Sequence, residues 1–263
     1  MQADETNGFS RLLWGPNRYL AASPWGPFGA LLITVVAIGA QLVVYLLPLA
    51  IGLIAGLDKA NVDALTHDMG SLKTPIGAAA MVAAQLASFA VIWAAAGYRG
   101  ARADVLRLGS PKPAWETAVL AGLAVSTATG LFELVLYLLF PYDLFADSRW
   151  LAEGLREPTG WAVALSALVL APLWEEALFR GFLLSSLAQT RLGYWPAAVL
   201  STTLWTLLHL GYSWPGMTSV FVAGIALSWL MQRTGSMRAV VVAHGVANAI
   251  AVAFALQFAP ATA

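Results

Sequence analysis

Cysteine is absent from the 263-residue sequence, and charged side chains are scarce, at 11% of all residues. Without cysteine the chain has no disulfide, no thiolate nucleophile and no cysteine-ligated metal. A soluble domain of this length would carry about twice that share of charged residues. Because 59% of the residues are hydrophobic and the mean hydropathy is +0.73, the composition indicates an integral membrane protein.

A bias toward one sign of charge is also missing, because 14 basic residues balance 14 acidic ones. We therefore expect no nucleic-acid partner, and the lipid bilayer is the expected surrounding. No apolar core followed by a small-residue cleavage site precedes residue 28, so we expect no cleavable signal peptide. Nothing in the sequence indicates an oligomeric state.

Seven apolar runs, separated by glycine, proline and charged clusters, predict an all-α polytopic transmembrane bundle of about seven spans, with six to eight possible. They cover residues 28–55, 76–97, 115–140, 161–188, 195–210, 217–231 and 239–258. The fifth and sixth are short enough to form a hairpin. We divide this single membrane domain into an interfacial N-terminal segment (1–27), N-terminal helices (28–160) and a helical core (161–258).

Basic residues orient the bundle, because they accumulate in loops that stay in the cytoplasm. A cytoplasmic N-terminus places nine basic residues inside and four outside. The nine are Arg11, Arg18, Arg99, Arg102, Arg107, Lys112, Arg191, Arg233 and Arg238, and the four are Lys59, Lys73, Arg149 and Arg156. We therefore predict a protein of the plasma membrane, in bacteria the inner membrane, with its N-terminus inside and its C-terminus outside.

The densest group of ionisable residues in an apolar run is Glu175, Glu176 and Arg180, just after Pro172. A charge at the centre of a spanning helix costs roughly 2.5–3.5 kcal/mol, so the group indicates function. Glu176 and Arg180 share a helix face and can pair, which leaves Glu175 free for chemistry. The alternative is a structural ion pair, but two acids against one base leave a charge unpaired. Pro172 should free backbone carbonyls nearby.

Two later runs each carry a pair of side chains one helical turn apart, Trp205 with His209 and His244 with Asn248. A lone histidine such as His209 is more often a hydrogen-bonded packing residue than a catalytic one. Two polar groups deep in apolar sequence, such as His244 and Asn248, are harder to explain by packing. Because polar groups in membranes generally face the bundle interior, we predict one site shared by three helices.

A carboxylate in a dry pocket can take a proton from water that attacks an amide carbonyl. The histidines and Asn248 would then supply donors to the developing oxyanion. Alternatively, Glu175, His209 and His244 could bind zinc with a position open for water, and Asn248 would support that site as an oxyanion donor. The sequence leaves the metal-dependent and the glutamate-only mechanism open. A proton-relay transporter is a further alternative.

The three motifs resemble the signatures of the CPBP family (CAAX protease and bacteriocin-processing, also called Abi or type II CAAX prenyl endopeptidase-like) of intramembrane proteases. The signatures are a double glutamate with an arginine four residues on, an aromatic residue four before a histidine, and a histidine four before an asparagine. They match Glu175-Glu176-Ala-Leu-Phe-Arg180, Trp205-Thr-Leu-Leu-His209 and His244-Gly-Val-Ala-Asn248, roughly within residues 161–255. Trp205 stands where phenylalanine is usual, and we expect it to fill the same packing role.

The resemblance implies an intramembrane endopeptidase with Glu175 as general base. Glu176 and Arg180 would position that base, while His209, His244 and Asn248 would bind the water, a metal or the oxyanion. The implied partner is a peptide or protein substrate that enters from the membrane or the cytoplasmic side. The alternative is a non-catalytic membrane scaffold or a bacteriocin-immunity-type protein that retains the family site.

The predicted spans place the two histidines at different depths. At 1.5 Å per residue from the cytoplasmic ends, His209 would lie about 20 Å deep and His244 about 9 Å deep. A tilted or re-entrant fifth helix would be needed to bring the two side chains together.

Overall fold

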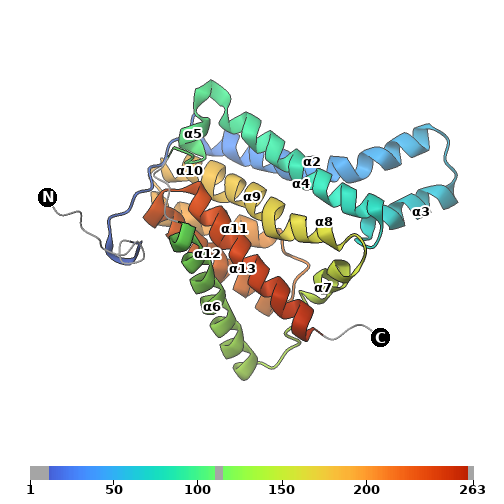
Figure 1. Ribbon diagram of the computed structural model, residues 1–263. Helices are drawn as coiled ribbons and strands as arrows, with labels where there is room; N and C mark the ends of the chain where they lie inside the picture. Colours follow the sequence, from blue (N-terminus) through green and yellow to red (C-terminus); the bar gives the residue numbers. More distant parts are fainter. Residues whose placement is uncertain (1–11, 110–114, 260–263) are drawn as a thin grey trace.

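The structure is a computed structural model that describes residues 12–109 and 115–259, and these residues form helices and connections without a strand (Figure 1). Six of the described helices are long and apolar enough to cross a membrane. They are α2 (Pro27–Ile54), α4 (Pro75–Ala96), α6 (Trp115–Leu139), the composite helix α8–α10 (Gly160–Ala188), α12 (Trp214–Thr234) and α13 (Met237–Phe258). The predicted polytopic helical bundle is confirmed, and six of its helices are long enough to cross a membrane.

The fifth expected span, residues 195–210, is the shorter helix α11 (Tyr194–Leu207). Its 14 residues extend about 21 Å, which is less than the hydrocarbon core of a bilayer. The helix ends early because Ser213 begins the next one: the Ser213 hydroxyl accepts from the Gly216 N–H, and Pro215 occupies the first turn of α12. The chain therefore turns from α11 into α12 over residues 208–213.

The composite helix contains two π-helical segments. It consists of α8 (Gly160–Leu165), η2 (Ser166–Leu170), α9 (Ala171–Glu176), η3 (Ala177–Leu183) and α10 (Leu184–Ala188). Pro172 has no N–H to donate to the carbonyls four and five residues before it. One of these, the Ala167 carbonyl, accepts instead from the side-chain amide of Asn248 on α13 at 2.8 Å. Pro172 thus frees a carbonyl that joins two spans.

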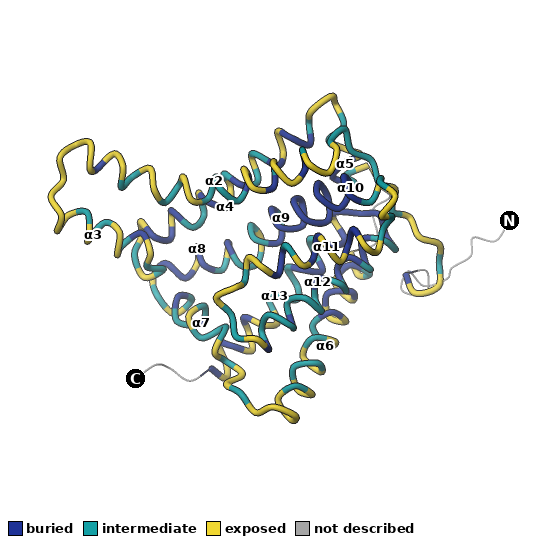
Figure 2. Tube along the Cα trace, turned by 180° about the vertical axis from the view of Figure 1, so that it is seen from behind, coloured by how far each residue is buried: buried dark blue, intermediate teal, exposed yellow. Residues whose placement is uncertain are grey.

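Buried residues concentrate along α9, η3 and α10 at the centre of the bundle, while α2 and α6 expose most of their length (Figure 2). Phe179, Phe182 and Leu183 are fully buried there. α2 packs along α4, and α6 along α13. The outward faces of α2 and α6 carry large apolar side chains, such as Leu32 and Leu138. The lipid tails of a bilayer would cover these surfaces, and the contact costs no free energy because the tails are as apolar as the side chains.

The two ends of the bundle differ in charge. One end, which we call the basic end, holds η1 (Tyr98–Gly100), α5 (Arg102–Val105) and the connections that follow α10 and α12. Its described basic residues are Arg18, Arg99, Arg102, Arg107, Arg191, Arg233 and Arg238. Arg11 and Lys112, expected on the same side, lie outside the described residues.

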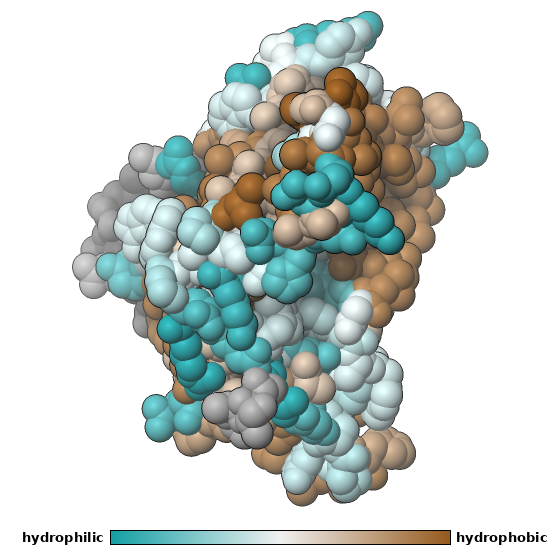
Figure 3. Space-filling model, turned by 90° about the vertical axis from the view of Figure 1, so that its right-hand side faces the viewer, coloured by the Kyte–Doolittle hydropathy of each residue, from teal (hydrophilic) through white to brown (hydrophobic). Residues whose placement is uncertain are grey.

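The opposite end, which we call the α3/α7 end, holds α3 (Lys59–Gly70), α7 (Arg149–Arg156) and the turn at residues 208–213. The basic residues at this end are Lys59, Lys73, Arg149 and Arg156. Hydrophilic side chains gather over this face (Figure 3). The loops of the α3/α7 end are therefore suited to an aqueous surface.

Candidate active site

Glu176 and Arg180 form an ion pair at the centre of the bundle. The Arg180 Nη1 donates to Glu176 Oε1 at 2.9 Å, and both side chains are essentially inaccessible to solvent. Nη2 of Arg180 donates to the Gly224 carbonyl of α12 at 3.2 Å. The guanidinium also lies over the Trp205 ring, 4.3 Å from its centroid. The pair therefore joins the composite helix, α11 and α12.

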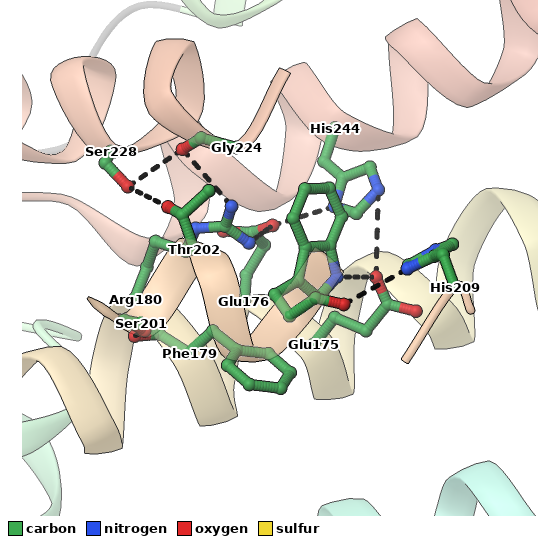
Figure 4. A network of polar contacts seen from close by, with 11 residues as sticks. Glu175, Glu176, Phe179, Arg180, Ser201, Thr202, His209, Gly224, Ser228 and His244 are labelled. Atoms are coloured by element: carbon green, nitrogen blue, oxygen red, sulfur yellow. Dashed lines mark hydrogen bonds and ion pairs between the residues drawn. The ribbon is translucent and has the colours of Figure 1, made fainter. Parts of the chain in front are cut away.

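His244 connects the two glutamates (Figure 4). Its Nδ1 lies 2.8 Å from Glu176 Oε1, and its Nε2 lies 4.0 Å from Glu175 Oε2. An ionised carboxylate only accepts hydrogen bonds, so Nδ1–H is the donor to Glu176. The paired glutamate thus orients the imidazole and turns its Nε2 toward Glu175.

Glu175 is held by a hydrogen bond that the sequence motif did not predict. Trp205 Nε1 donates to Glu175 Oε2 at 2.7 Å. We expected Trp205 to act in packing alone, as phenylalanine would. The indole N–H adds a donor that phenylalanine lacks, and hydrogen bonds to charged groups are worth about 1.5–3 kcal/mol. Trp205 therefore fixes the position of the carboxylate as well as packing against Arg180.

His209 and His244 both meet the Trp205 ring edge to face, with ring centroids 5.4 Å and 5.6 Å from it. Nδ1 of His209 is 3.1 Å from the Trp205 carbonyl, which can only accept, so Nδ1 carries the proton and Nε2 remains available. Both histidines are thus anchored through Nδ1. Each has its Nε2 left for a water molecule or a substrate.

The two histidines lie at similar depths, unlike the prediction, because the ends of their helices are staggered. Asn248 contacts Ala167, and eleven residues separate it from Met237, so α13 begins near the level of residue 178 of the composite helix. That level is about 15 Å inside the end of α10 at Ala188. His244 lies about 10 Å further along α13 than Met237, so its depth below the end of α10 is about 25 Å. Measured from the start of α11, His209 lies at a similar depth of about 22 Å. No re-entrant helix is needed.

Asn248 lies at the edge of the cluster. Its side-chain nitrogen donates to the Ala167 carbonyl. Its side-chain oxygen takes no part in this hydrogen bond and can accept another one. Four of the six predicted residues contact one another directly: Glu175, Glu176, Arg180 and His244. His209 is connected to them through Trp205, and Asn248 through the backbone of the composite helix. Their catalytic roles stay predictions.

Tyr212 was not among the predicted residues. Its ring meets His209 edge to face, with centroids 5.1 Å apart. Burial raises the pKa of Tyr212 to about 12, and the negative charges of Glu175 and Asp147 contribute to this rise. The one hint in the sequence is that Tyr212 follows His209 by three residues. That spacing does not predict a contact when a turn lies between the two residues.

Part of the chain matches the model of a known family. Residues 157–250 match the family model described as "Type II CAAX prenyl endopeptidase Rce1-like". The match covers 94 of the 263 residues and supports a relation of this segment to the CAAX protease family. The match agrees closely with the region expected from the motifs, and it indicates a CAAX-protease-type hydrolase that is integral to a membrane. No curated protein and no solved structure matches the chain.

The predicted zinc ligands Glu175, His209 and His244 are not arranged around a common point. Within the described residues, no three histidine or acidic side chains are grouped so that they could hold a metal ion. Trp205 moreover occupies one oxygen of Glu175 as a hydrogen-bond donor. As they stand, the three side chains do not fit an ion, although the anchoring of both Nδ1 atoms is also typical of metal-ligating histidines. Zinc binding stays a prediction.

Proposed function

We propose that the chain is an intramembrane endopeptidase in which Glu175 activates water. The observation that carries the proposal is the buried chain Arg180–Glu176–His244–Glu175, in which one glutamate serves the pair and the other is left facing the histidines. A purely structural ion pair would need only Glu176 and Arg180. The second carboxylate and the two oriented imidazoles are what water-mediated hydrolysis requires.

In the proposed reaction, Glu175 takes a proton from water, and the resulting hydroxide oxygen bonds to the carbonyl carbon of the peptide. The negative charge that develops on the carbonyl oxygen is stabilised by Nε2 of His244 or His209, once that nitrogen also carries a proton. Glu175 then returns the proton to the leaving amine as the C–N bond breaks.

The roles of the remaining residues follow from their contacts. Glu176 and Arg180 position His244 and Trp205, and Trp205 positions Glu175. The substrate is a peptide or protein segment, as the family suggests. The N-terminus is proposed to lie in the cytoplasm, because Leu12, the first described residue, accepts a hydrogen bond from Arg233 at the basic end.

Glu175→Gln tests the proposal. Glutamine is of the same size, and its oxygen still accepts from Trp205, so the fold should survive while the base is lost. Wild-type and variant proteins would be reconstituted in liposomes with a peptide library, and released peptides compared by mass spectrometry. We expect cleavage to fall by about 10²–10⁴-fold.

The matched control is Glu116→Gln, because Glu116 lies exposed in the first turn of α6. This variant should cleave like the wild type. Full cleavage by Glu175→Gln would overturn the proposal. In that case a non-catalytic scaffold or immunity-type protein, which keeps its cellular phenotype without Glu175, becomes the better description.

A further inference from the structure

A row of backbone carbonyls on α12 connects the candidate site to distant parts of the chain. Gly224, Ser228 and Gln232 follow one another at intervals of four residues, so they lie along one face of the helix. The Gly224 carbonyl accepts from Arg180 Nη2 at 3.2 Å (Figure 4). One turn on, the Ser228 carbonyl accepts from the hydroxyl of Tyr194, the first residue of α11. The row therefore links Tyr194 to the partner of Glu176.

The third carbonyl of the row, that of Gln232, binds residues 12–26, which we call the N-terminal strap. The backbone N–H groups of Arg18 and Tyr19 donate to it at 3.0 and 3.2 Å. Gln232 belongs to the last turn of α12, where the carbonyls have no N–H partner within the helix. The strap thus caps α12 at the end of the row.

The strap also holds Tyr194 from the side. The rings of Tyr19 and Tyr194 meet edge to face, with centroids 4.9 Å apart. Three residues on, Ala22 exchanges two hydrogen bonds with the Ser185 hydroxyl of α10, at 2.9 and 2.6 Å. Because the strap is fixed to α12 before Tyr19 and to α10 after it, the Tyr19 ring has a defined place against Tyr194.

The turn between Ser228 and Gly224 is closely packed. The Ser228 hydroxyl donates at 2.8 Å to the same Gly224 oxygen that receives Arg180, and it lies 3.4 Å from the Thr202 hydroxyl of α11. Arg180, Thr202 and Ser228 are all buried. A rotation or a shift of α12 would therefore move the acceptor of Arg180 and strain the ion pair with Glu176.

We propose that Tyr194 is a positioning residue of the site and that the strap, through Tyr19, keeps it in place. α12 supplies none of the predicted catalytic side chains, so its contribution is the carbonyl that holds Arg180. By binding the Ser228 carbonyl, Tyr194 fixes the turn that carries this acceptor. The inference rests on the proposed function. It extends the site to the strap, which lies outside the family match at residues 157–250.

Tyr194→Phe tests the positioning role, because it keeps the ring against Tyr19 and removes only the donor to Ser228. Tyr142→Phe is the matched control: the Tyr142 hydroxyl also donates to a helix carbonyl, that of Glu133 at 3.3 Å, but from the connection after α6. With a peptide that the wild type cleaves, we expect kcat of Tyr194→Phe to fall about two- to tenfold, as for one lost hydrogen bond. KM should stay unchanged, because Tyr194 acts on the reacting groups and not on peptide binding.

Tyr19→Leu tests the contribution of the strap, with Trp14→Leu as its control, because Trp14 is in the strap and is 85% exposed. We expect a similar decrease in kcat for Tyr19→Leu and none for Trp14→Leu. In the Tyr19→Leu/Tyr194→Phe double variant the two losses should not multiply, because both act through the same turn of α12. Should Tyr19→Leu fail to fold, Tyr194→Phe alone decides.

The inference is overturned if kcat of Tyr194→Phe equals that of Tyr142→Phe, or if KM rises while kcat is unchanged. Fully multiplied losses in the double variant would overturn the link to the strap. Glu175→Gln in the same assay separates this inference from the proposed function. Cleavage lost in Glu175→Gln but unaffected in Tyr194→Phe removes only the positioning role, whereas full cleavage by Glu175→Gln with a reduced kcat in Tyr194→Phe removes only the proposed base.

Discussion

Replacing Gly224 by alanine tests whether close contact between α12 and the Arg180–Trp205 pair holds the site together. A Cβ at this position would lie 2.5 Å from Thr202 Cγ2, 2.8 Å from Arg180 Nη2 and 2.9 Å from Trp205 Cε3. All three neighbours are buried, so at least one side chain must move. Overpacking of this kind costs about 1–3 kcal/mol. For a chain of this size, the loss corresponds to a decrease in Tm of roughly 2–12 °C.

Activity should fall with stability, because Trp205 also donates to Glu175. Losing a hydrogen bond to a charged group costs about 1.5–3 kcal/mol, which corresponds to a decrease in kcat/KM of about tenfold or more. Tryptophan fluorescence during heating of the detergent-purified protein gives Tm, and peptide release gives kcat/KM. Gly130→Ala on α6 is the matched control, because nothing lies within 4 Å of its added Cβ. Equal Tm values for the two alanine variants would refute the reasoning.

Three further predictions concern the same bundle. Trp205→Phe keeps the ring over Arg180 but removes the indole donor, so kcat/KM should fall about tenfold or more while Tm changes little; unchanged kinetics would show that the hydrogen bond to Glu175 is not used. Arg233→Gln removes the cation that binds the Leu12 and Leu13 carbonyls, so limited proteolysis should cut residues 12–26 faster than in the wild type, and an equal rate would contradict the anchoring of this segment by Arg233. Elemental analysis of active protein tests zinc directly: one zinc per chain that is lost in His209→Ala would support the predicted ligands, and active protein without zinc would refute them.

Hydropathy and motif spacing were sufficient for most of the spans and for the residues of interest. A bilayer requires about 20 apolar residues per helix, so span length is already present in the sequence. Glu176 and Arg180 were predicted to pair because residues four apart share a helix face, and they do so at 2.9 Å. The fifth span was predicted too long, because hydropathy alone does not register that Ser213 and Pro215 begin a new helix.

Contacts between distant segments required the tertiary structure. That His244 connects Glu176 to Glu175, and that Trp205 donates to Glu175, depends on the relative rotation of the helices that carry them, which no local pattern encodes. The stagger of α13 likewise depends on packing, since its first residue lies well inside the end of α10. Residues 12–26, polar or interfacial in sequence, are placed by hydrogen bonds to segments more than 160 residues away. The sequence by itself therefore determined the solvent of this protein and the chemistry of its polar residues, because both depend on composition and local spacing, whereas only the tertiary structure decided which of these groups meet.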